Sequence, residues 1–106
     1  MTDKELLELS AKAAGINIFD WTPGGRPTTD GSYDGIWNPL TDDGDALRLA
    51  AELGITVSFW GHLESVATYT PDDGTPAAQE SYSQGRDVAV RRAIVRAAAE
   101  LGRDKP

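Results

Sequence analysis

Three closely spaced carboxylates, Asp42, Asp43 and Asp45, are the residues whose chemistry first invites a functional interpretation. They could hold a divalent cation, with Asp72 and Asp73 as further ligands. A calcium-binding EF-hand loop, however, needs ligands at alternate positions, a central glycine and a distal glutamate. This run is too short and leads directly into a helix. We therefore predict that the aspartates cap that helix and interact with the positive end of its dipole.

Other reaction centres lack the partners that they need. His62 is the single histidine and the chain has no cysteine, so a zinc site or a catalytic triad cannot be assembled from the usual residues. No serine lies in a nucleophile elbow. Gly24 and Gly25 have neither the glycine spacing nor the Lys-Ser/Thr pair of a phosphate-binding loop. We therefore expect no catalytic residue, no metal and no cofactor, and an enzymatic role is not favoured.

The aromatic residues Trp21, Tyr33, Trp37 and Trp60 allow two interpretations. The chain has three tryptophans in 106 residues, and they could simply fill the space between a sheet and its helices. Alternatively, some of them belong to a partner surface, because Trp, Tyr and Arg dominate binding hot spots. Residues 22–35 favour the second view, since they form a long loop with four glycines and two prolines.

Charge is distributed unevenly along the chain, whose net charge is −7. Residues 86–106 hold six basic and three acidic side chains, whereas residues 1–85 hold four basic and fourteen acidic ones. The arginines either pair with acidic neighbours or contact an acidic partner. Direct nucleic-acid binding is disfavoured, because it needs a larger basic surface. The predicted interaction surface comprises Trp21, Arg26, Tyr33, Trp37, Arg92 and Arg96.

The aspartates open a helix that is predicted to begin near Leu40, after Pro39, and to end at Gly54. Its apolar residues recur at the spacing of one buried helix face. That face comprises Ala46, Leu49, Ala50 and Leu53, widened by Leu47 and Ala51.

Two further helices and five strands complete the prediction. The first helix spans about Asp3 to Ala14, behind a capping box formed by Thr2 and Glu5. The last helix starts near Arg86 or Asp87 and ends at Gly102, with a buried stripe of Val90, Ala93, Ile94, Ala97 and Leu101. The strands are predicted at 16–21, 33–37, 55–60, 65–70 and, as an edge strand, 80–83.

This order, α-β-β-α-β-β-(β)-α, predicts one α+β domain over residues 1–106. Short strands joined by hairpins imply a mainly antiparallel sheet. Because the strands carry Trp and Phe on both sides, we expect helices to cover both faces of the sheet, as in a small α/β/α sandwich.

Three segments resemble the phage ABA sandwich family of small phage and prophage proteins. They are the opening run Met1–Leu9, the central run Trp37–Ala50 and the closing run Arg92–Gly102. The resemblance implies an α/β sandwich encoded by a phage or an integrated prophage. It carries over no activity and no functional residues.

The expected function is that of a non-enzymatic phage or prophage accessory protein that binds another protein of the host or the phage. The alternatives are a small-ligand-binding or enzymatic domain, and an acidic DNA mimic that inhibits a nucleic-acid-binding protein. No apolar run reaches the ~20 residues that span a bilayer, and the N-terminus does not resemble a signal peptide. The bacterial cytoplasm is the expected location, and the oligomeric state is left open.

Overall fold

The structure, a computed structural model, describes residues 1–30 and 35–105. The elements are α1 (Asp3–Ala14), β1 (Asp20–Trp21), β2 (Pro27–Thr28), α2 (Asp43–Leu53), β3 (Thr56–Trp60), β4 (Ser65–Tyr69), β5 (Ala78–Ser81) and α3 (Arg86–Arg103). The predicted α+β class, with antiparallel strands packed on helices in the predicted order, is confirmed. Among the described residues, no helix is both long and apolar enough to cross a membrane.

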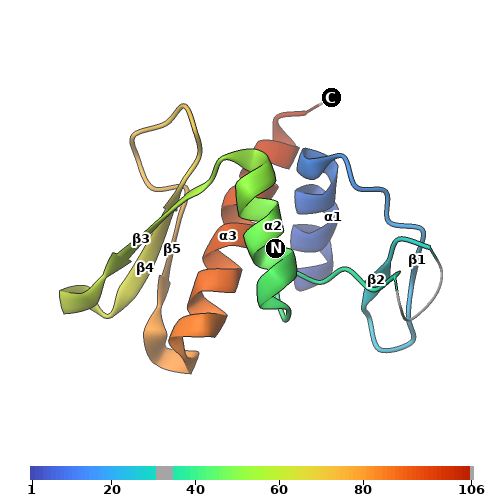
Figure 1. Cartoon of the computed structure of the whole chain (residues 1–106), viewed down its shortest axis with the longest axis horizontal. Coiled ribbons are helices and arrows are strands. Elements are labelled where there is room, and N and C mark those ends of the chain that lie inside the picture. The colour runs from blue at the N-terminus through green and yellow to red at the C-terminus, as the bar shows by residue number, and fades with distance from the viewer. Residues whose placement is uncertain (31–34, 106) are drawn as a thin grey trace.

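Helix α3 lies at the centre of the molecule, with α1, α2 and the three-stranded sheet packed around it (Figure 1). The sequence predicted a single buried stripe on this helix. Val90 and Leu101 of that stripe are only half-buried. Since a helix enclosed by neighbours is apolar on several sides, its buried residues spread around the axis. They are Ala89, Ala93, Ile94, Val95, Ala97, Ala98, Ala99 and Gly102.

Helix α1 packs along α3 more extensively than any other pair of described elements. The predicted capping box is present at its start, where Glu5 N donates to Thr2 Oγ1 at 3.2 Å. Near the end of α3, a Cβ on Gly102 would lie 1.9 Å from the Leu9 carbonyl oxygen. The absence of a side chain at Gly102 therefore allows α1 and α3 to approach each other closely.

Helix α2 starts at Asp43, three residues later than the predicted start near Leu40, and Asp42 is its N-cap. The Asp45 amide donates to Asp42 Oδ2 at 2.7 Å. Gly54 ends the helix in the left-handed conformation, with φ of 68°, which glycine adopts without a Cβ penalty. The buried face is narrower than predicted, because both Leu47 and Ala51 are exposed.

The main sheet has the order β3-β4-β5 and is antiparallel throughout. Val66 and Thr68 of β4 face α3, and Thr68 Oγ1 donates to the Ala93 carbonyl oxygen at 2.8 Å. Helices were expected on both faces of this sheet, but all three α-helices of the described chain lie on the same side of it (Figure 1). Trp60 and Ser65 pair on the opposite face, where Trp60 is half-buried without a covering helix.

A second, two-stranded sheet pairs β1 with β2 at the other end of the molecule (Figure 1). The sequence predicted a longer first strand over 16–21 and its partner at 33–37. The observed partner, Pro27–Thr28, instead lies inside the predicted 22–35 loop. From the predicted 33–37 strand, Ile36 makes only an isolated bridge to Thr28. Two-residue strands carry too little alternation to be recognised from sequence.

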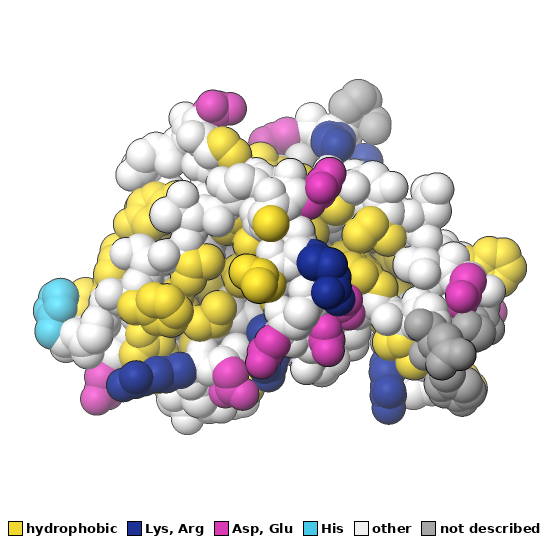
Figure 2. Space-filling view, in the orientation of Figure 1, with side chains coloured by type: hydrophobic (Ala, Val, Ile, Leu, Met, Phe, Trp, Pro, Cys, Tyr) yellow, Lys and Arg dark blue, Asp and Glu magenta, His cyan; other side chains and the backbone are white. Residues whose placement is uncertain are grey.

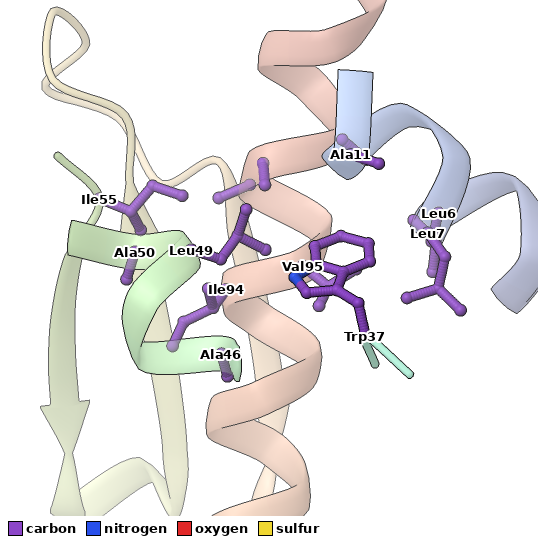
Figure 3. Close-up of a cluster of buried hydrophobic side chains, with 13 residues drawn as sticks. Leu6, Leu7, Ala11, Trp37, Ala46, Leu49, Ala50, Ile55, Ile94 and Val95 are labelled. Atoms are coloured by element: carbon purple, nitrogen blue, oxygen red, sulfur yellow. The ribbon is translucent and has the colours of Figure 1, made fainter. Parts of the chain in front are cut away.

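The core joins α1, α2 and α3 around Trp37 (Figure 3). This tryptophan lies against Val95 of α3, between the side chains of α1 and α2. Leu49 and Ile94 pack beside it where α2 meets α3. The core is thus formed mainly between helices, and a smaller apolar cluster joins α3 to the sheet.

Candidate functional site

An apolar groove runs between α2, α3 and the edge strand β3. Its volume is about 870 Å³. Figure 2 shows hydrophobic side chains gathered on this face, with charged side chains below them. The apolar lining residues include Leu47 and Ala51 of α2, Val57 and Phe59 of β3, and Val90 and Ile94 of α3.

Two large side chains in this groove are open to solvent. Leu47 is 69% exposed and Phe59 is 61% exposed. Phe59 projects on the same face of the sheet as Val66, with which it pairs across the strands. It lies at the edge of the sheet, where α3 no longer covers it completely. The groove is therefore a solvent-exposed extension of the apolar layer between the sheet and the helices.

Arg91, whose side chain is mostly buried, is one of the polar residues that line the groove. Its Nη1 lies 2.6 Å from Asp43 Oδ1 and 3.6 Å from Asp87 Oδ2. Its Nε donates to the Leu40 carbonyl oxygen at 2.9 Å. Arg91 therefore ties α3 to the start of α2. Its charge is matched by the carboxylates of Asp43 and Asp87.

Arg86 lies at the mouth of the groove and is exposed. Its guanidinium stands 5.3 Å from the centre of the Tyr82 ring. In the part of the chain that the structure describes, no carboxylate lies within ion-pair distance of Arg86. A cation without an acidic partner thus adjoins the apolar surface.

No family model, curated protein or solved structure matches this chain.

The aromatic part of the predicted surface is divided between core and periphery. Trp37 is 9% exposed and belongs to the core, so it offers no surface to a partner. Trp21 is half-buried against the same core, with Lys4 Nζ at 5.1 Å from its ring. Arg26 is exposed and lines a polar depression with Asp42 and other residues. Tyr33 lies outside the described residues.

The arginine part of the predicted surface is engaged in ion pairs. Arg92 Nη2 lies 3.0 Å from Asp3 Oδ1, and thereby joins α3 to α1. Arg96 forms an ion pair with Glu80 and donates to the Gln79 carbonyl oxygen at 3.2 Å. This pairing with acidic neighbours is one of the two arrangements that the sequence allowed.

The aspartates near the start of α2 accept hydrogen bonds from other residues of the chain. Asp45 Oδ2 accepts from the Asn38 amide at 2.9 Å, and Asp45 Oδ1 accepts from Arg48 at 2.7 Å. Far along the chain, a hydrogen bond from the Thr75 amide, followed by one from its hydroxyl, lowers the pKa of Asp73. Among the residues that the structure covers, no three His, Asp or Glu side chains are grouped to hold a metal ion.

We expect calcium or magnesium at millimolar concentration to leave the melting temperature unchanged, because the aspartates already accept hydrogen bonds from the chain. A specific site would add about 2.7 kcal/mol at a hundredfold excess over its dissociation constant. Thermal melts with each cation check this expectation. As a control, Asp42→Ala removes the cap and costs roughly 0.5–2 kcal/mol with or without the cation. A saturable stabilisation that Asp42→Ala abolishes would contradict the capping interpretation.

The sequence did not identify the groove as a surface. Leu47 and Ala51 were assigned to the buried face of α2, and Phe59 falls within the strand predicted at 55–60. One signal was present, since the apolar arc of α2 is wider than a single buried face requires. Such an excess indicates a second contact on the same helix.

Proposed function

We propose that this chain is a protein-binding domain and that the groove between α2, α3 and β3 is its docking surface. The observation that carries the proposal is the joint exposure of Leu47 and Phe59 along one continuous apolar lining. Single exposed hydrophobic residues are common on protein surfaces, but a contiguous patch of them marks an interaction site. Charged residues at the rim, such as Arg86 and Asp87, agree with the usual anatomy of an interface.

The two alternative functions receive less support. A ligand site would combine an apolar pocket with a few converging polar groups. Here two of the polar lining residues, Arg91 and Asp43, are paired with each other, and Arg86 is the remaining cation of the lining. A DNA mimic would need a row of free carboxylates, whereas Asp43 and Asp45 are bound by arginines of the chain.

A phage or prophage origin, and action on a host or phage protein in the bacterial cytoplasm, remain part of this proposal. They rest on the resemblance of the opening, central and closing runs to the phage ABA sandwich family. The groove adds a surface to that expectation, and it replaces the 22–35 loop as the favoured contact region.

Photo-crosslinking in bacterial cells tests the groove. We expect a benzoylphenylalanine introduced at Phe59 to give a covalent adduct with a protein. The same probe at Phe19 provides a matched control, because Phe19 is 72% exposed but does not line the groove. Adding Leu47→Lys to the Phe59 probe should remove the adduct, since a charge is then buried in the same contact. Equal adducts from both probe positions, or no adduct from either, would contradict the proposal.

A further inference from the structure

We propose that the groove is occupied by a second copy of this chain, whose β3 strand pairs antiparallel with β3 around a two-fold axis at Ser58. This inference rests on the proposed function, because it names the partner of the same surface. It also extends the main sheet from three strands to six across the dimer.

The first observation is the difference between the two edges of the sheet. At the β5 edge, Arg96 donates to the Gln79 carbonyl oxygen at 3.2 Å and forms an ion pair with Glu80. Natural proteins shield edge strands in such ways to prevent unwanted pairing. The β3 edge has no comparable shield, because no hydrogen bond of the described residues joins Thr56–Trp60 to any element except β4.

The second observation is the composition of β3. The strand Thr56-Val57-Ser58-Phe59-Trp60 contains no charge, no proline and no glycine, so nothing in it opposes edge pairing. Antiparallel pairing centred on Ser58 sets Val57 opposite the partner's Phe59 on the groove side. Pairs of an aromatic and a β-branched residue are favourable across strands. The strand is therefore complementary to a copy of itself.

The third observation is the position of α2. The sheet packs on α3, and α2 lies beside α3 on the side of β3. Among the described strands, none covers the exposed Leu47 and Ala51 of α2. A strand added to the β3 edge would cover this part of α2. Its inward side chains, the partner's Val57 and the partner's Phe59, would enter the groove. The groove thus has the position of a missing fourth strand.

Charge complementarity favours a second copy over an unrelated strand. Arg86 lies at the Trp60 end of β3, because its ring contact Tyr82 is hydrogen bonded through its amide to Glu64 at 2.9 Å. The other end of β3 follows the C-terminus of α2, which has no basic residue in its last turn. A two-fold axis brings Arg86 to the negative end of the partner's α2, where a cation is stabilising.

Sedimentation velocity over a concentration series tests the pairing. We expect the purified chain to form dimers, and Phe59→Lys to raise the dimer dissociation constant by at least about tenfold. Phe19→Lys, the same change at an exposed phenylalanine outside the groove, should leave that constant unchanged. If Phe59→Lys does not fold, Leu47→Lys tests the same groove from α2. A chain that stays monomeric up to about 1 mM, or a dimer that tolerates the groove variants, overturns the inference.

A charge reversal at Arg86 tests the two-fold geometry. Arg86→Glu should weaken the dimer by about three- to tenfold, because a negative charge then meets the negative end of the partner's α2. An unchanged dimer dissociation constant overturns the proposed axis.

The two proposals fail in different ways. If the Phe59 crosslink joins the chain to a different protein while the purified chain is monomeric, the groove binds protein and the second-copy inference is wrong. If Phe59 gives no adduct and the chain is monomeric, both proposals are wrong.

Discussion

Leu49→Ala is expected to lower the free energy of unfolding by roughly 2–5 kcal/mol. Leu49 is 2% exposed and packs where α2 meets α3 (Figure 3). Its truncation removes buried apolar surface and leaves a cavity, because Trp37 and Ile94 are held by their own neighbours. Urea unfolding followed by tryptophan fluorescence measures the loss.

Leu47→Ala is the matched control, because it makes the same change two residues away on the same helix. At 69% exposure, Leu47 contributes little to the fold of a single copy. Measured at a concentration where the chain is monomeric, this variant should stay within about 0.5 kcal/mol of the wild type. Equal losses from the two variants would mean that the faces of α2 are assigned incorrectly.

Gly102→Ala is expected to destabilise the chain by about 3 kcal/mol, although alanine is the better helix former. The added Cβ would stand 1.9 Å from the Leu9 carbonyl oxygen, which is a backbone atom and cannot rotate away. Helices α1 and α3 must therefore separate along their shared apolar face. Thermal and urea unfolding both report the change.

Gly74→Ala is the control, because it replaces a glycine by alanine at a position where the added Cβ meets no other atom. No atom lies within 4 Å of the position that a Cβ on Gly74 would take. Its φ is not among the positive values of the described glycines. This variant should be nearly neutral. If Gly102→Ala were equally neutral, the close approach of α1 and α3 would not be a feature of the fold.

Local interactions made several parts of this fold predictable from sequence. The Thr2–Glu5 capping box, the Asp42 cap and the Gly54 stop each depend on residues within a few positions of one another. Strand β3 was recognisable by its alternation, although the observed strand starts one residue later than predicted. These features follow from hydrogen-bond geometry and side-chain periodicity, which the chain carries without reference to its neighbours.

The positions of the short strands β1, β2 and β5 could be determined only from the tertiary structure. β1 and β2 are two residues each, and their pairing depends on the path of the chain between α1 and α2. β5 was predicted at 80–83 but spans Ala78–Ser81, because its register is set by β4. Long-range pairing of this kind leaves little trace in local propensity.

The distinction between core and surface was decided by tertiary packing alone. Leu47 and Leu49 are the same residue type on one helix, yet one lies in the groove and the other in the core. As a tryptophan, Trp37 was a candidate for the interaction surface. It is buried because the three helices pack around it. The sequence by itself determined which residues are apolar and which residues cap and stop the first two helices. Which apolar residues remained uncovered depended on where the sheet ends, because β3 is an edge strand and no fourth strand within residues 1–30 and 35–105 covers α2.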